Sequence, residues 1–146
     1  MAAAAPSIQP NRSIGLVNAF SLLATGTFVS DEISVPRDIS TLAAQSTFVR
    51  AAGGGTCDVF LQTSLDRGDT WVDIAQWAFT TSSATRIHAV RSYIALAANY
   101  TPTDGALSDN TIKDGLMGDR LRVKTIIAGT SYTGSSTLDV DLVVTQ

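Results

Sequence analysis

The sequence predicts an all-β fold, a two-sheet antiparallel β-sandwich of jelly-roll or immunoglobulin-like type with an extended N-terminal arm. From residue 21 onward, short segments rich in β-branched and aromatic residues are separated by Gly, Asp, Ser and Pro, which is the spacing of strands and turns in a sandwich. No long stretch shows a helical period. A chain of 146 residues also fits one domain with one core.

The first segment, residues 1–20, differs from the rest of the chain. It contains Pro6 and Pro10 and few apolar side chains that could anchor it in a core. We therefore expect an extended arm that a partner would order. The packed domain is expected to comprise residues 21–146.

The clearest strand is the last, "STLDVDLVVTQ", in which apolar and polar side chains alternate strictly. Its predicted partner is "GDRLRVKTIIAG", joined to it through the Gly- and Ser-rich "GTSYTGSS" as a hairpin. Three basic residues on this partner, Arg120, Arg122 and Lys124, would then face Asp139 and Asp141 across the pair.

Two further strands, "TCDVFLQTSL" and "TWVDIAQWAFT", flank a predicted hairpin loop at residues 66–69. Asp66 can hydrogen-bond to its own backbone, and Gly68 supplies a positive φ. The loop contains Arg67-Gly68-Asp69, the tripeptide of integrin ligands. Because turn chemistry accounts for Asp66 and Gly68, we interpret the motif as an exposed turn.

The two tryptophans lie six residues apart, so Trp71 and Trp77 share a face if their strand is regular. A sandwich core or a subunit contact is favoured for them over a platform that stacks on sugar rings. The following stretch, "ATRIHAVRSYIALAANY" at residues 84–100, is predicted as strand, either one long strand or a pair broken near Ser92, although its alanine content leaves a helix open.

A loop at residues 101–118, rich in Pro, Gly, Asp and Asn, is too long for a turn and is interpreted as a lid or contact loop. The segment holds aspartates at intervals of five that fit no EF-hand, so solvated loop acids are favoured over a metal site. They are Asp104, Asp109, Asp114 and Asp119. Asp104 and Asp109 would be the first ligands to test if an ion were bound.

Composition argues against several classes of function. Net charge is -3 and only 16% of residues are charged, which disfavours a nucleic-acid partner and suits a chain in contact with other subunits. The single cysteine, Cys57, is predicted to be a buried thiol, and the single histidine, His88, a strand residue. We predict no enzymatic activity, cofactor, metal or membrane span, and we expect the chain to be synthesised inside a cell.

Two stretches carry a resemblance to a known class of proteins. "VFLQTSLDRGDTWVDIAQWAFT" and "GDRLRVKTIIAGTSYTGSSTLDVDLVV" resemble small β-sandwich virion proteins of tailed bacteriophages in hairpin style and strand order. The resemblance covers roughly residues 40–146. It implies a structural role as a capsid decoration (cement) protein, a neck component or a tail accessory protein, acting as a symmetric oligomer without chemistry.

The leading hypothesis is therefore a decoration protein that is made in the host cytoplasm and located in the virion. It would bind the major capsid protein or other virion proteins. We expect it to be a homo-oligomer, and the local symmetry of capsids suggests a trimer. A neck or tail protein, and a carbohydrate-binding or adhesin module, are the alternatives. Partner contacts are expected in the arm and the long loop, at Ile8, Arg12, Ile14, Leu107, Ile112, Leu116 and Met117.

Overall fold

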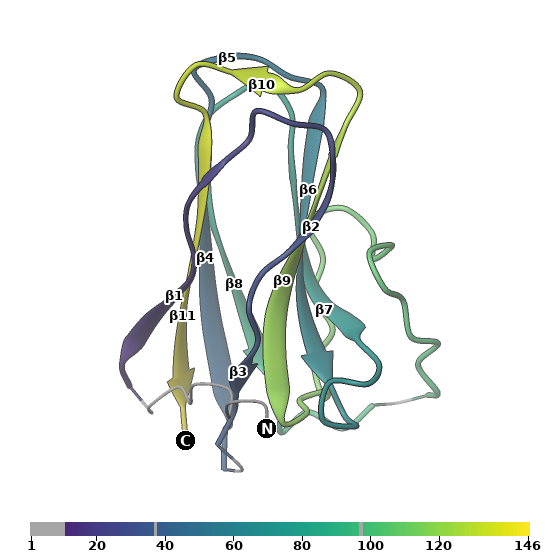
Figure 1. Ribbon diagram of the computed structural model, residues 1–146. Coiled ribbons are helices and arrows are strands. Elements are labelled where there is room, and N and C mark those ends of the chain that lie inside the picture. The colour runs from purple at the N-terminus through teal and green to yellow at the C-terminus, as the bar shows by residue number, and fades with distance from the viewer. Residues whose placement is uncertain (1–10, 37, 97) are drawn as a thin grey trace, which may run out of the picture.

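The computed structural model describes residues 11–36, 38–96 and 98–146, and two antiparallel sheets packed face to face dominate it (Figure 1), which confirms the predicted β-sandwich. None of the described residues belongs to a helix long and apolar enough to cross a membrane. The strands are β1 (Ser13–Ser21), β2 (Gly26–Val29), β3 (Ile33–Ser34), β4 (Thr41–Val49), β5 (Ala52–Gly53), β6 (Thr56–Ser64), β7 (Val72–Phe79), β8 (Ala84–Arg91), β9 (Arg120–Ala128), β10 (Tyr132–Thr133) and β11 (Thr137–Thr145).

The strand order is that of a jelly roll. One sheet has the order β1-β11-β4-β8, and the other has β2-β9-β6-β7 with β3 also paired to β9. We take β2 and β3 as one interrupted strand and set the short β5 and β10 aside. The first strand, β1, then pairs with the last, β11, and the pairs nested inside it are β2 with β9, β4 with β8, and β6 with β7. This nested pairing distinguishes the jelly roll from the immunoglobulin-like alternative.

The last strand has the predicted alternation but not the predicted partner. Leu138, Val140, Leu142 and Val144 are all fully buried in the core. β11 pairs with β1 and β4, whereas β9 pairs with β2, β3 and β6 in the opposite sheet. The predicted hairpin is wrong because the connection, which includes β10, crosses one end of the sandwich from sheet to sheet (Figure 1).

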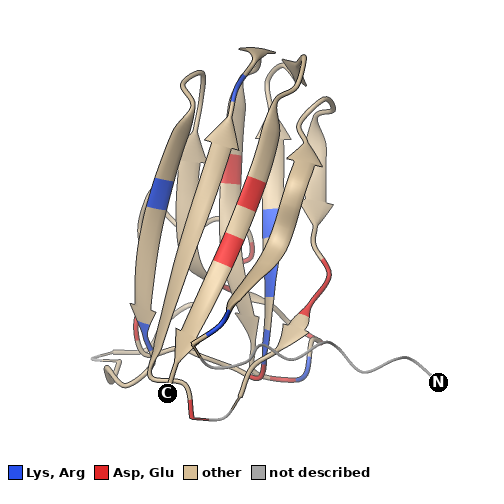
Figure 2. Cartoon of the chain, turned by 90° about the vertical axis from the view of Figure 1, so that its left-hand side faces the viewer, with Lys and Arg blue, Asp and Glu red and all other residues tan. Residues whose placement is uncertain are grey.

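The basic residues of β9 consequently do not face Asp139 and Asp141. They lie on the outer side of the other sheet, where Arg120 pairs with Glu32 and Lys124 pairs with Asp104. The acids of β11 lie on the outer face of the four-stranded sheet (Figure 2).

The packed domain starts earlier than residue 21. Residues 13–21 form β1, which pairs with β11 along its length, so the part of the predicted arm from Ser13 onward belongs to the sandwich. Two register shifts interrupt β1, one between Gly15 and Val17 and one between Val17 and Phe20. These bulges break the period of two, which is why the pattern is not visible in the sequence. Residues 1–10 of the predicted arm lie outside the described residues.

β8 ends at Arg91, and the predicted continuation to residue 100 is wrong. The Ser92 amide donates to the Ser40 carbonyl at 2.9 Å, and the Ser92 hydroxyl also donates to that carbonyl. This hydroxyl ties the chain to the segment before β4 at the point where the strand stops.

The core between the sheets is closed at one end by an aromatic cluster. Phe48 stacks on Phe79 with ring centroids 4.9 Å apart, and Tyr132 meets Phe48 edge-on at 5.2 Å. The Tyr132 hydroxyl donates to the Thr80 carbonyl, and burial raises the pKa of this hydroxyl to about 12. Gly54, with φ of +99°, lies flat against the Tyr132 ring, which leaves no room for a Cβ.

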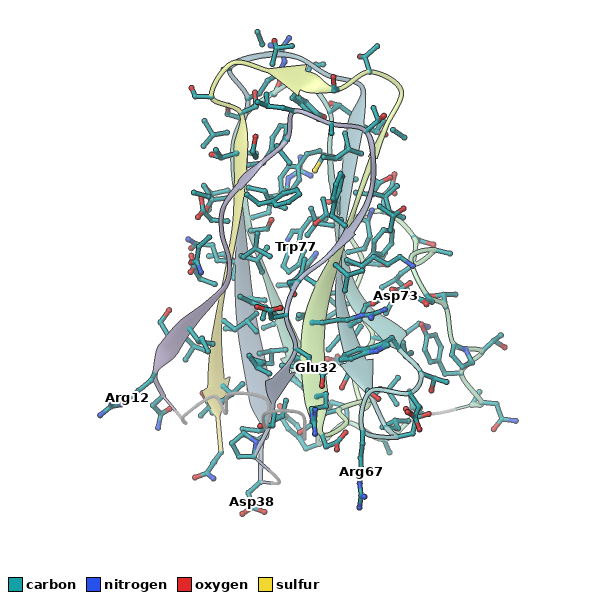
Figure 3. The ribbon with its side chains drawn as sticks, in the orientation of Figure 1. Arg12, Glu32, Asp38, Arg67, Asp73 and Trp77 are labelled. Carbon is teal, nitrogen blue, oxygen red and sulfur yellow. The ribbon has the colours of Figure 1, made fainter. Side chains whose placement is uncertain are left out.

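A bulge in β7 separates the two tryptophans. Leu61 pairs with Ala75 but Gln62 pairs with Asp73, so Ile74 is an extra residue in the ladder. Trp77 is therefore fully buried between the sheets (Figure 3), as the core interpretation predicts. Trp71 lies outside this core, with the Arg122 guanidinium 4.3 Å from its ring centroid. The regular strand that would place both rings on one face does not exist.

Candidate docking surface

The long loop is fastened along the outer edge of β7. Residues 98–119, here called the strap, run beside this strand on the right of Figure 1. The Asp73 amide donates to the Thr103 carbonyl at 2.8 Å, and the Gln76 amide donates to the Thr111 carbonyl at 3.0 Å. The Lys113 amide in turn donates to the Ile74 carbonyl at 2.8 Å. The strap thus covers a sheet edge that would otherwise present unpaired backbone groups.

One buried carboxylate organises the strap. Asp73 is fully buried and accepts backbone hydrogen bonds at 2.8 to 3.1 Å from the consecutive amides of Gly105, Ala106 and Leu107. The Asp73 carboxylate also accepts from the Thr103 hydroxyl and from the side-chain amide of Gln62, both at 2.8 Å. Hydrogen bonds to an ionised acceptor are among the stronger ones in proteins, so this residue fixes the path of the strap.

Two of the evenly spaced aspartates bind residues of neighbouring strands. The Asp104 carboxylate accepts from Lys124 at 3.0 Å and from Gln62 at 2.6 Å. Asp114 accepts from the amide and the guanidinium of Arg91. These contacts hold the pKa of Asp104 and of Asp114 below the ordinary value although burial opposes the shift. Asp104, Asp109 and Asp119 are exposed, as the interpretation as solvated loop acids predicts, but Asp104 and Asp114 also form ion pairs with strand residues.

The remaining two aspartates also hold the strap in place. Asp109 accepts from the Gln76 side-chain amide at 3.3 Å, and the same amide donates to Asp58 at 3.2 Å. Burial and the charge of Asp109 raise the pKa of Asp58. Asp119 contributes its backbone, whose amide donates to the Ser64 carbonyl at 3.0 Å. Among the described residues, no group of three potential ligands gathers around an ion site.

The hairpin between β6 and β7 confirms the predicted turn. Arg67 has φ of +62° and Gly68 has φ of +97°. The Asp66 carboxylate accepts from the amide and hydroxyl of Thr70 and from the Ser64 hydroxyl, and these bonds hold its pKa below the ordinary value. The Ser64 hydroxyl accepts in turn from the Gly68 amide at 2.7 Å. The tip is consequently rigid while its side chains are exposed.

The same end of the sandwich carries an apolar surface, here called the basal surface. It includes Leu65, Tyr93 and Leu96, whose side chains are 62%, 64% and 44% exposed. Two hollows of about 470 and 340 Å³ adjoin it and share Leu65 as a common wall. Large apolar side chains gathered beside hollows are typical of protein interaction sites.

The predicted partner-binding residues differ in how accessible they are. Arg12 is exposed at the start of β1, and Leu116 and Met117 line the basal hollows, so these can reach a partner. Leu116 and Met117 also pack partly against the core, as do Ile14 and Ile112. Leu107 is half-buried beside Asp73, and Ile8 lies outside the described residues.

Sequence reasoning missed the exposed members of the basal surface. Leu65 is the last residue of a predicted strand that ends at Ser64 in the structure, and Tyr93 and Leu96 belong to a predicted strand that ends before them. An apolar residue just beyond a strand has no sequence signature that separates an exposed position from a buried one.

The single histidine and the single cysteine are both used in packing. The His88 Nε2 atom lies 2.8 Å from the Gln76 carbonyl oxygen, and its ring centroid lies 5.1 Å from that of Trp77. His88 thereby joins β8 to β7 and closes one side of the sandwich. Cys57 is fully buried, as predicted, and burial together with the charge of Asp58 raises the pKa of its thiol to about 12.

Comparisons of the chain with protein-family models, with curated proteins and with solved structures give no match. The jelly-roll strand order and the basal surface are therefore the two observations from which a function can be argued. Exposed apolar surface of this kind is typical of contacts with other macromolecules.

Proposed function

We propose that this protein is a non-enzymatic structural protein of a tailed-phage virion, and specifically a capsid decoration protein that binds and stabilises the assembled shell of major capsid protein. The observation that carries the proposal is the basal surface, where Leu65, Tyr93 and Leu96 are exposed at one end of a rigid jelly roll. Jelly rolls occur in viral capsid proteins as well as in lectins and cupins. An exposed apolar patch on such a scaffold is suited to docking.

The use of the polar side chains supports a structural role. Asp73 and Asp104 hold the strap, Asp114 pairs with Arg91, and His88 joins two strands. Trp77 is buried and the Arg122 guanidinium lies over the ring of Trp71, so the pair forms no joint platform for a sugar ring. This arrangement favours the decoration protein over a carbohydrate-binding module.

The proposal is tested by copy number in purified particles. Quantitative mass spectrometry of the phage encoding the chain should find copies in proportion to the capsomers of the shell. Far fewer copies, as at a neck or tail, would replace the decoration role with the neck or tail alternative. Absence from the particles would overturn a virion role altogether.

A second test addresses the surface itself. Purified protein is mixed with shells that lack it, and bound protein is measured after sedimentation. The double variant Leu65→Asp/Leu96→Asp should bind at least about tenfold more weakly, because it places charge in the proposed apolar contact. Val49→Asp is the matched control, since Val49 is 42% exposed at the opposite end of the sandwich. Equal binding by both variants would contradict docking through the basal surface.

A further inference from the structure

Most basic side chains in the described ranges are engaged by partners within the chain. Arg91, Arg120, Arg122 and Lys124 form ion pairs with acidic side chains. The others with hydrogen bonds or ring contacts are Arg50, Arg86 and Lys113. Among the described residues, this leaves Arg12 and Arg67 as basic residues without a hydrogen bond, ion pair or ring contact.

Arg67 is presented by the hairpin tip rather than folded against the protein. Figure 3 shows its side chain projecting from the lower end of the sandwich. Its φ of +62° is sparsely populated by residues other than glycine and persists where surrounding contacts determine the backbone. The hydrogen bonds of Ser64 and Asp66 do so here. A guanidinium held in this way loses little conformational freedom of its backbone on binding.

An opposite charge lies on another part of the molecule. The outer face of the four-stranded sheet carries a hollow of about 300 Å³ lined by Ala43, Ile87, Asp141 and Val143. The Asp141 carboxylate is half-buried and has no hydrogen-bond or ion-pair partner among the described residues. Ile87, at 65% exposure, gives the hollow an apolar wall. Figure 2 looks onto this sheet and shows acidic positions in the middle of one strand.

The tip and the hollow match in chemistry. The tip offers the exposed Arg67 cation, and the hollow offers the Asp141 carboxylate beside Ile87. The tip belongs to the β2-β9-β6-β7 sheet and the hollow to the opposite one, so they face away from each other within one copy. Only a second molecule can bring them together.

We propose that the Arg67 tip of one copy docks in the Asp141 hollow of a second copy. The contact joins two different surfaces and is therefore heterologous. Successive copies form a ring if the rotation between neighbours closes, and an open chain if it does not. This inference rests on the proposed function only for the biological role of the contact, which would join neighbouring decoration proteins. The contact itself is a property of the purified protein.

The test uses charge reversal and light scattering over a range of concentrations. Wild-type protein should show a mass that rises with concentration to a discrete oligomer or a chain. Arg67→Glu and Asp141→Lys should each weaken self-association at least about tenfold, because each places like charges in the contact. The double variant Arg67→Glu/Asp141→Lys should associate again, since the reversed charges attract.

Mixing the two single variants gives the sharpest result. An equal mixture should associate although neither variant does so alone, because the normal tip of Asp141→Lys fits the normal hollow of Arg67→Glu and the reversed tip of Arg67→Glu fits the reversed hollow of Asp141→Lys. Arg50→Glu is the control, because it changes net charge equally at the opposite end of the sandwich. Circular dichroism checks that every variant is folded, and Arg67→Gly removes the cation without introducing an acid.

The outcomes separate this contact from the proposed function. Wild-type protein that stays monomeric at all concentrations, or an Arg67→Glu variant that associates like wild type, would overturn the contact. A mixture of the single variants that stays monomeric would do the same. Monomeric wild-type protein that still binds shells would leave the decoration role standing. Self-associating protein absent from particles would instead overturn that role and leave the contact standing.

Discussion

The Asp73 carboxylate binds the Gly105 amide with both of its oxygens, at 2.9 and 2.8 Å. These two residues lie 32 positions apart in the sequence, and their contact anchors the strap to β7. The Ala106 and Leu107 amides converge on the same carboxylate. The course of the strap therefore depends on one buried acid.

Replacing Asp73 with Asn should destabilise the protein by about 3 kcal/mol. An amide group has a single acceptor oxygen, so its NH₂ would be placed against backbone donors that then lack partners in a buried site. Urea unfolding measures the effect. Asp31→Asn is the control, because the exposed Asp31 side chain has no partner among the described residues and its change should cost less than about 0.5 kcal/mol. Equal losses in the two variants would contradict the role of Asp73.

The pair formed by Asp58 and Asp109 should make stability depend on pH. The pKa of Asp58 is raised by burial and by the charge of Asp109, so the folded state binds this proton more tightly than the unfolded state does. The stability that Asp58 contributes is therefore present at low pH and is lost as pH rises from its ordinary pKa through the raised one.

Asp109→Asn should lower the pKa of Asp58 towards its ordinary value, because it removes a negative charge while its amide oxygen still accepts from Gln76. A carboxyl-carbon NMR titration of Asp58 measures this change. Stability at neutral pH should rise by less than about 1 kcal/mol, since the site is partly exposed and solvent screens the charges. An unchanged titration of Asp58 would show that burial alone raises its pKa.

The sequence predicts the fold class well because the sandwich core obeys a period of two. Residues 137–145 alternate strictly, and the hairpin at Asp66–Asp69 follows from local turn chemistry. The irregular ladders of two strands are missed. Bulges in β1 break its alternation, so the sequence predicts an arm there. The extra residue Ile74 in β7 places Trp71 and Trp77 on different faces of the sheet.

Pairing between sheets is the other part that the sequence does not reveal. β9 and β11 are close in sequence and both alternate, yet the segment with β10 carries the chain across the end of the sandwich. The strap aspartates are likewise unpredictable, because Asp104 and Asp114 find Lys124 and Arg91 only once the sheets have formed. Exposure of Leu65 and Leu96 depends on the same long-range packing.

Cys57 should resist thiol reagents in the folded protein. Burial raises the pKa of its thiol to about 12, so the reactive thiolate is scarce at pH 8 and is also shielded from solvent. The rate of labelling with a chromogenic disulfide reagent should follow the rate of unfolding as urea is added. Labelling within seconds in native buffer would contradict the buried position.

Gly54→Ala should destabilise the protein far more than Gly129→Ala. Both glycines have a positive φ, +99° and +80°, so each substitution strains the backbone by about 1 kcal/mol. At Gly54 the new Cβ would also lie 2.0 Å from a Tyr132 ring carbon, whereas at Gly129 the nearest atom is 3.4 Å away. Displacing a buried ring adds about 2 kcal/mol or more. Thermal unfolding of the two variants compares these costs, and equal losses would show that the Tyr132 ring can move aside.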